Sequence, residues 1–199
     1  MPKIVDKEQK RFEIANQSKE LLIEKGIAKL TVSEVAKNAG IGKGTIYQYF
    51  NSKDDIVFAI IDAYIEDELV GLDKDLEALD SFEQKLYRYF DFILQSEQEY
   101  RQKQLKGYLE YLSIAIVSHD ANMQAFNNEC RKKFKLRLTK IIDDAIVKKE
   151  ITPKAKDLVG GLYAIEKGFV IIGGTENESQ IDLQMKLFLD SLIEIIRIK

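Results

Sequence analysis

The sequence predicts an all-α protein of about nine helices, with an N-terminal helix-turn-helix domain of three helices and a larger C-terminal helical domain. Three observations support this fold class. Apolar residues recur at the three-to-four-residue spacing of helices along most of the 199 residues. Only 2 prolines and 11 glycines interrupt the chain. No stretch alternates apolar and polar residues in the manner of a half-buried strand.

The N-terminal segment carries clear helix start and stop signals. A first amphipathic helix is expected over residues 7–25, with Gly26 at its C-cap. Thr31 begins the second helix, and Glu34 follows three residues later in the arrangement of a capping box. A fourth helix is expected from residue 53 to residue 70, behind a serine cap.

Residues 31–53, TVSEVAKNAGIGKGTIYQYFNSK, predict a helix, a glycine turn and a second short helix. Two helices that cross steeply need a small residue at the crossing point, which Ala36 supplies. The turn needs a residue that tolerates positive φ, which Gly40 supplies. Apolar residues expected to join the two helices are Val35, Ile41 and Ile46.

The rest of the chain predicts five long helices around one C-terminal core. They are expected over residues 81–95, 97–117, 121–149, 153–172 and 178–196. Thr152 and Pro153 are typical of an N-cap followed by the first helical position. We therefore predict a DNA-binding-type helix-turn-helix domain over residues 1–53 and a second domain over residues 54–199.

Charge is distributed unevenly between these two domains. The whole chain has a net charge of −3, but residues 1–53 hold 10 Lys and Arg against 6 Asp and Glu, a net +4. Residues 54–199 hold 20 against 27, a net −7. A basic excess confined to the helix-turn-helix segment suits binding to phosphates, and the acidic remainder disfavours contact with DNA elsewhere.

Composition argues against several classes of protein. The single cysteine, Cys130, excludes an internal disulfide and a cysteine-based metal cluster. The only histidine, His119, has neither a nucleophile nor enough further ligands for a zinc site. We find no catalytic constellation, no nucleotide-binding glycine motif and no cofactor signature, so an enzyme is not expected. The charged N-terminus lacks an export signal and no uninterrupted apolar stretch suits a membrane helix, so a cytoplasmic protein is expected.

The outward face of the third helix carries small, hydroxyl-bearing, amide and basic side chains that suit phosphates and base edges. The run EKG…LTVSEVAKNAGIGKGTIYQYFNSKDDI closely resembles the DNA-binding domain of the TetR family of bacterial transcriptional regulators. The likeness covers residues 14–60 and is specific at GTIYQYFNSK. It implies a C-terminal domain for effector binding and dimerisation, which the chain matches in layout.

The resemblance also implies roles for residues of the helix-turn-helix. Base edges would be contacted by Lys43, Gly44 and Gln48. Phosphates would be contacted by Thr45, Tyr47, Tyr49 and Lys53, and the backbone would be clamped by Thr31 and Ser33. Tyr49 has a second interpretation, because it could fill part of the domain core. Gly42 stands where the family often has serine, which leaves the third helix without a side-chain cap.

Aromatic and apolar residues of the C-terminal domain are candidates for an effector cavity. They are Phe90, Ile93, Tyr108, Tyr111, Leu112, Phe126, Cys130, Phe134, Tyr163 and Phe169. Each of them individually fits core packing better than ligand contact. As a set, the tyrosines offer an apolar wall with hydroxyl groups, which suits a lipophilic, acyl-CoA-like effector.

The last two helices carry more apolar surface than one neighbour would cover. Residues expected at a dimer interface are Leu158, Leu162, Ile165, Phe188, Leu189, Leu192 and Ile196. A four-helix bundle between two protomers would bury them, and packing within one chain is the alternative. Taken together, the sequence predicts a homodimeric repressor that leaves its double-stranded operator when a small, largely apolar effector binds. A constitutive or architectural DNA-binding protein without an effector is the alternative.

Overall fold

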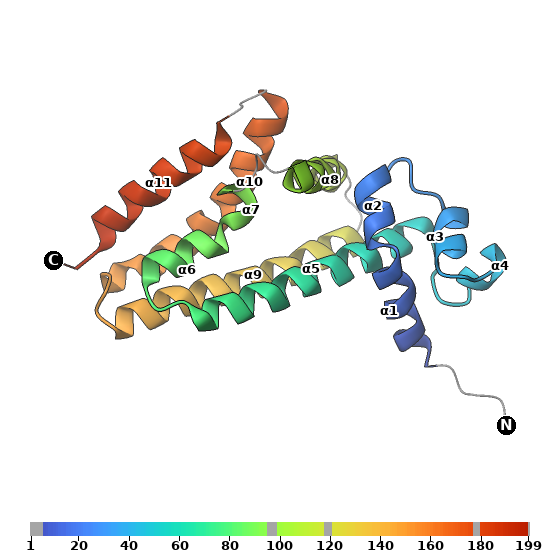
Figure 1. Ribbon diagram of the computed structural model, residues 1–199, viewed down its shortest axis with the longest axis horizontal. Helices are drawn as coiled ribbons and strands as arrows, with labels where there is room; N and C mark the ends of the chain where they lie inside the picture. The colour runs from blue at the N-terminus through green and yellow to red at the C-terminus, as the bar shows by residue number, and fades with distance from the viewer. Residues whose placement is uncertain (1–5, 95–98, 118–120, 177–179, 199) are drawn as a thin grey trace. The chain divides into compact units, whose positions relative to one another are not determined.

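The computed structural model describes residues 6–94, 99–117, 121–176 and 180–198. Within these ranges the chain forms eleven α-helices and one 3₁₀ helix, so the prediction of an all-α protein is confirmed (Figure 1). Its contacts divide the chain into two compact units, Met1–Val70 and Gly71–Lys199.

The N-terminal unit is built from five helices. They are α1 Lys7–Gln17, α2 Lys19–Lys25, α3 Val32–Asn38, α4 Lys43–Ile46 and α5 Lys53–Ala78, the last of which continues into the second unit. The single helix predicted over residues 7–25 is divided at Ser18. The Ser18 hydroxyl is buried and donates to the Ile14 carbonyl oxygen at 2.8 Å. Such a side-chain bond competes with the regular backbone ladder and gives the helix a place to break.

One apolar cluster holds the N-terminal unit together. Its buried members are Ile14, Ala15, Leu30, Val35, Ala36, Ile46, Phe50, Ile56, Val57, Ile60 and Ala63. The last four belong to the first half of α5, which supplies one wall of this core. The unit therefore extends to Val70, whereas the sequence led us to place the boundary after residue 53.

The second unit contains the remaining helices. They are α6 Phe82–Tyr89, α7 Asp91–Leu94, α8 Glu99–Val117, α9 Ala121–Val147, η1 Pro153–Leu158, α10 Val159–Thr175 and α11 Ile181–Ile196. The helix predicted over residues 81–95 is interrupted at Phe90, whose ring is fully buried. The Phe90 N–H donates to two successive carbonyl oxygens, those of Leu86 at 3.2 Å and Tyr87 at 3.1 Å, where the chain turns into α7.

Helix α10 is the element around which the second unit packs. It contacts α7, α8, α9, α11 and η1, while α6 lies against α9 and α11 against α7 (Figure 1). A short antiparallel bridge joins the end of α11 to the loop before η1. There the Thr152 N–H donates to Ile196 O at 2.8 Å, and the Ile198 N–H donates to Glu150 O at 3.1 Å.

Helix α10 and the 3₁₀ turn before it are unusually apolar. Among the described residues, Pro153–Thr175 is the one helical stretch long and apolar enough to cross a membrane, although the core helix of a soluble protein can meet the same criteria. Only 17% of its most apolar 18-residue window is buried inside the chain. The protomer alone therefore leaves much of this apolar helix uncovered.

Candidate functional site

The turn between α3 and α4 has the geometry expected of a helix-turn-helix. Gly40 adopts a φ of 66°, in the left-handed region that favours glycine. The Ile41 N–H returns to the Ala36 carbonyl oxygen at 2.9 Å, which closes the turn over a small, buried residue. Gly42 is the N-cap of α4 and provides no side-chain cap, as the sequence predicted.

The structure places most of the predicted DNA-contacting residues on the surface. The predicted residues that are exposed are Thr31, Ser33, Lys43, Gly44, Tyr47 and Gln48. Thr45, Tyr49 and Lys53 are partly buried. Tyr47 is 51% exposed although it is a large aromatic residue. Packing in the core of its unit therefore does not explain why a tyrosine stands at this position. Tyr49 packs against the core cluster, in line with the second interpretation given to it above.

The start of α3 is fixed by a capping box. The Thr31 hydroxyl donates to Glu34 Oε2 at 2.8 Å and accepts the Glu34 N–H at 3.3 Å. Lys25 pairs with the same carboxylate, and these hydrogen bonds lower the pKa of Glu34 to about 2. The Thr31 hydroxyl is therefore engaged within α3, which leaves Ser33 as the freer hydroxyl at this end of the helix.

Lys53 begins α5, and its ammonium group donates to the Ala28 carbonyl oxygen at 3.4 Å. That contact is long and exposed, so it holds the side chain weakly. The lysine also lies in the first turn of a helix, where backbone N–H groups favour anions. Its position is compatible with the phosphate contact that the family resemblance implied.

Arg11 of α1 ties the end of the α4 segment to the start of α5. Its guanidinium group donates to the Tyr49 carbonyl oxygen at 2.5 Å and to both carboxylate oxygens of Asp55, at 2.8 and 3.2 Å. It also lies 4.6 Å from the centre of the Phe50 ring. Asp55 accepts the Asn51 N–H at 2.8 Å as well, and the hydrogen bonds from Arg11 lower the pKa of Asp55. This network fixes the end of the segment that begins with α4 and continues through Gln48.

In the second unit, several of the predicted effector residues come together. Tyr108 stacks on Tyr111 with ring centres 6.3 Å apart, and Tyr111 meets Phe126 edge-on at 6.1 Å. The Tyr89 hydroxyl donates to the Phe134 carbonyl oxygen at 3.3 Å. Burial raises the pKa of Tyr163 to about 12. Tyrosines from α6, α8 and α10 therefore face a common region.

Other predicted effector residues are ordinary core. Phe90 and Ile93 have no exposed surface, and Leu112 and Cys130 are also buried. Phe169 is partly buried on α10. The structure thus favours core packing for Phe90 and Ile93, and keeps the tyrosines as the better candidates for ligand contact.

Sequence reasoning missed Glu166 and Lys167, which lie in the middle of α10 beside these tyrosines. Burial raises the pKa of Glu166 to about 7, with the neighbouring Lys167 acting in the opposite direction. Lys167 donates to the Tyr108 hydroxyl at 2.7 Å. The signal was present in the sequence, because these two charges interrupt the otherwise apolar run GGLYAIEKGFVIIGG.

Comparison with known proteins agrees with this geometry. A family model described as bacterial regulatory proteins of the tetR family matches residues 14–60. The fatty acid metabolism regulator protein of Bacillus subtilis (strain 168) is 29% identical over 127 residues, which cover 53% of this chain and 66% of that protein. The chain belongs to the TetR family. It spans about a third to two thirds of the length of the curated relatives that it matches.

Solved structures share the fold over nearly the whole chain. A TetR-family transcriptional regulator from Cytophaga hutchinsonii has a TM-score of 0.76 at 20% identity, with 99% of both chains covered. FadR from Bacillus subtilis in complex with stearoyl-CoA has a TM-score of 0.68 at 19% identity, covering 91% of this chain and 96% of that one. TetR-family proteins are regulators and not enzymes, which confirms that part of the prediction.

The structure revises the predicted dimer residues. Leu162, Leu189 and Ile196 are buried inside the protomer, so they pack within the chain and are not available to a partner. Leu158, Ile165, Phe188 and Leu192 are partly buried. The large apolar residues that α11 exposes are Leu183, Leu187 and Ile195, none of which is among the predicted interface residues. The expected helices therefore turn a different face outward.

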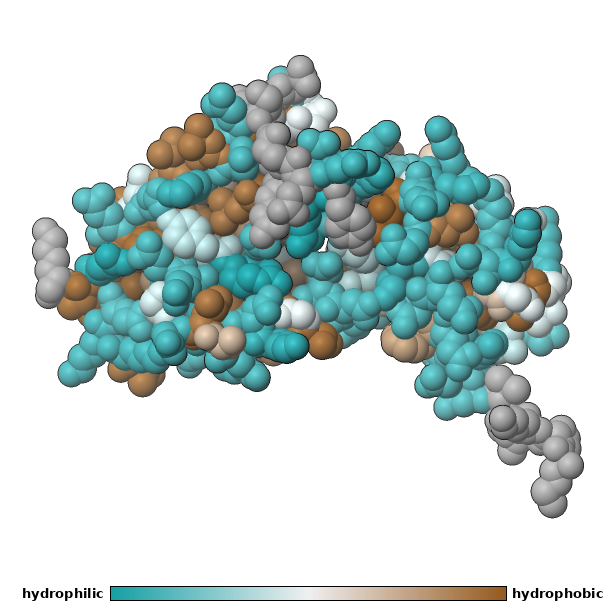
Figure 2. Space-filling model, in the orientation of Figure 1, coloured by the Kyte–Doolittle hydropathy of each residue, from teal (hydrophilic) through white to brown (hydrophobic). Residues whose placement is uncertain are grey.

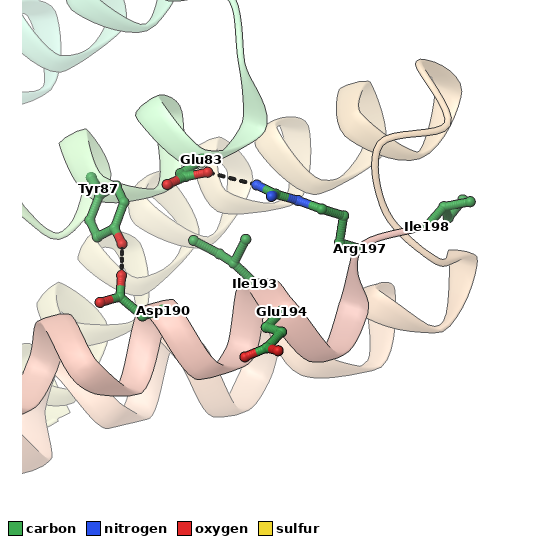
Figure 3. A pocket seen from close by; sticks show the side chains of 7 residues that line it. All are labelled: Glu83, Tyr87, Asp190, Ile193, Glu194, Arg197 and Ile198. Atoms are coloured by element: carbon green, nitrogen blue, oxygen red, sulfur yellow. Dashed lines mark hydrogen bonds and ion pairs between the residues drawn. The ribbon is translucent and has the colours of Figure 1, made fainter.

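A groove of about 340 Å³ lies between α6 and α11. It is lined by Glu83, Tyr87, Asp190, Ile193, Glu194, Arg197 and Ile198. Figure 3 shows that its polar groups largely bind one another: Arg197 pairs with Glu83 at 2.6 Å, and the Tyr87 hydroxyl donates to Asp190. This groove contains none of the predicted effector residues.

Metal binding finds no support in the part of the chain that the structure describes. No group of three or more His, Cys, Asp or Glu side chains there could hold a metal ion. His119 lies outside the described residues.

Proposed function

We propose that this chain is a homodimeric, cytoplasmic transcriptional regulator that binds a double-stranded DNA operator and releases it when a small, largely apolar effector binds. The observation that carries the proposal is the exposed face of α4. Lys43 begins α4, Tyr47 is its C-cap and Gln48 follows in the next turn, and all three residues are exposed.

The chemistry of that face suits the major groove. Lysine can donate to guanine O6 and N7, and glutamine can form paired hydrogen bonds with adenine. A side-chain atom added at Gly44 would have no other protein atom within 4 Å, so this position faces open space. With no side chain there, the backbone can approach the DNA closely. Tyr47 and Lys53 can anchor the head on phosphates without reading sequence.

The uncovered surface of α10 and α11 supports dimerisation. On α11, Leu187 is 56% exposed and Ile195 is 79% exposed, and with Leu183 they form one stripe at helical spacing. Figure 2 shows hydrophobic surface in the region where Figure 1 draws α11. The exposed face of α10 carries Gly161 and Ala164, which would let another helix approach closely. Two such pairs related by a two-fold axis would form a four-helix bundle.

Thermodynamic linkage between effector binding and operator binding explains how an effector releases the DNA. If the effector binds the conformation that does not fit DNA more tightly, operator binding and effector binding weaken each other by the same factor. The tyrosines of α6, α8 and α10 are the proposed contacts. The likeness to FadR with stearoyl-CoA supports the class of largely apolar effectors.

Fluorescence anisotropy with an operator selected from random DNA tests this proposal. The wild-type protein should bind it as a dimer, and Lys43→Ala or Gln48→Ala should weaken binding by about 1–3 kcal/mol. Stearoyl-CoA, or another largely apolar compound, should release the operator. Binding that no such compound alters would favour the constitutive alternative, and unaltered binding by both variants would remove α4 as the reading helix.

A further inference from the structure

The segment from Lys25 to Lys53 carries positive charge that its own acidic side chains do not balance. It holds five lysines, and Glu34 is its one acidic residue, so its net charge is 5 − 1 = +4. The Glu34 carboxylate is already occupied, because Lys25 pairs with it and the Thr31 hydroxyl donates to it at 2.8 Å. The segment that contains the helix-turn-helix therefore keeps lysines whose charge is open to a partner outside the chain.

Most other cations of the N-terminal unit are paired. In α1 and α2, Lys10 pairs with Glu13, Arg11 with Asp55, and Lys19 with Asp67. Within the described residues, the lysines that form no ion pair in the helix-turn-helix segment are Lys29, Lys37, Lys43 and Lys53. Lys43 and Lys53 are already expected to contact DNA. The remaining two have no assigned role.

Lys29 lies beside the start of α5. It directly follows Ala28, whose carbonyl oxygen accepts a hydrogen bond from the Lys53 ammonium group at 3.4 Å. The loop before α3 and the first turn of α5 therefore meet at this point, although they are distant in the sequence. Lys29 is exposed there, so a phosphate bound by Lys53 would lie close to a second lysine.

Lys37 lies on the outward ridge of α3. Residues four apart on a helix share a face, so Lys37 follows Ser33 along that ridge, and both are exposed. Val35 and Ala36 form the inward side of α3 and are buried in the core cluster. The family resemblance implied that Ser33 contacts the DNA backbone, and Lys37 extends the same ridge by one turn.

We propose that Lys29 and Lys37 are further contacts to the DNA phosphate backbone, so that α3 and the loop before it hold the duplex together with Lys53. This inference rests on the proposed function, because it adds contacts to the same DNA-binding unit. Phosphates carry the opposite charge at regular intervals along the duplex, and they require no base-specific geometry. Each lysine that binds a phosphate releases condensed counterions, so each contact steepens the salt dependence of DNA binding.

The salt dependence of binding to a random-sequence duplex tests both contacts. Fluorescence anisotropy at several salt concentrations would compare the full-length wild-type protein with Lys29→Gln and Lys37→Gln. In each variant the plot of log affinity against log salt concentration should become shallower by about 0.9 for each protomer bound. Affinity for the selected operator should fall by the same factor as affinity for the random duplex, because phosphates carry no sequence information. A wild-type slope in both variants would overturn the proposal.

Lys10→Gln is the matched control, because it removes the same charge from a lysine of the same unit that is already paired with Glu13. Its slope should equal that of wild type, and an equally shallow slope would assign the effect to net charge and overturn the proposal. Lys29→Arg and Lys37→Arg should keep the wild-type slope, since a guanidinium group also binds phosphate.

Operator selection separates this inference from the proposed function. Wild-type slopes in Lys29→Gln and Lys37→Gln, with normal selection of an operator, would leave the regulator standing and overturn these contacts. Shallower slopes in both variants, with no operator enriched by the wild-type protein, would support the contacts and contradict a sequence-specific regulator. A wild-type protein that binds no DNA would overturn both.

Discussion

Replacing Arg11 by glutamine tests how the DNA-reading helix is held in place. The change removes two hydrogen bonds to Asp55, one to the Tyr49 carbonyl oxygen and the contact with the Phe50 ring. Hydrogen bonds to charged groups contribute about 1.5–3 kcal/mol, and a cation–π contact adds about 0.5–1 kcal/mol. Both charged side chains are 23% exposed, so solvent screens them only in part. We expect the N-terminal unit to lose roughly 2–3 kcal/mol of unfolding free energy, since such terms are not additive.

Operator affinity should fall as well, because one of the lost contacts is to the Tyr49 carbonyl oxygen, just after α4. If about 1 kcal/mol of the lost stability appears as lost DNA-binding free energy in each N-terminal unit, the two units of a dimer would together lower operator affinity roughly thirtyfold. Arg11→Lys should recover only part of the loss, since lysine cannot donate to both oxygens of Asp55 and to Tyr49 in the same geometry.

Urea unfolding followed by circular dichroism and anisotropy with the selected operator would measure both effects. Lys10→Gln is the matched control, because it removes the same charge at the adjacent position, where the partner is Glu13 of the same helix. The stability difference between wild type and Arg11→Gln should shrink in acid. The pKa of Asp55 is lowered from 3.8, so its contribution is present above that value and is lost as pH falls through the folded pKa. Equal effects of Arg11→Gln and Lys10→Gln would refute the reasoning.

Three further predictions concern assembly, pH and phosphate contact. Leu187→Glu should give a folded but largely monomeric protein by light scattering, whereas Val147→Glu, at an exposed position outside α10 and α11, should remain dimeric; a dimeric Leu187→Glu protein would contradict the interface. Unfolding free energy should fall by roughly 3 kcal/mol as pH rises from about 4.5 to 7, because the raised pKa of Glu166 means that the folded protein binds more protons than the unfolded chain there. Glu166→Gln should lose this slope, and an unchanged slope would assign it to other groups. Lys53→Ala should weaken binding to all DNA sequences alike and lower the salt slope by about one unit, so a loss confined to the operator would exclude a simple phosphate contact.

The helix-turn-helix could be predicted from the sequence because its determinants are local. The capping box at Thr31 and Glu34 and the positive φ at Gly40 each depend on residues a few positions apart. The break at Ser18 could not be predicted in the same way. A serine in a helical pattern can face solvent or form a hydrogen bond with its own helix, and the sequence does not distinguish the two. The structure shows that Ser18 is buried and donates to the Ile14 carbonyl oxygen.

The candidate sites of the second unit depend on contacts between distant segments. Apolar periodicity showed that α11 has a broad apolar face, but not which part of it the protomer's own helices would cover. Leu189 is therefore core while Leu187, two positions earlier, is exposed. Glu166 was missed although it interrupts an apolar run in the sequence, because only the packing of α10 against its neighbours shows that this charge is partly buried.

Selection of DNA from a random library by the full-length protein tests the central claim most directly. A dimeric helix-turn-helix regulator should enrich sites with two-fold symmetry, whose half-sites are separated by about one helical turn, roughly 34–36 Å. Gln48→Ala should enrich sites of the same spacing with relaxed preference at one base pair of each half-site. Failure of the wild-type protein to enrich any sequence, or enrichment of single sites without symmetry, would contradict the account.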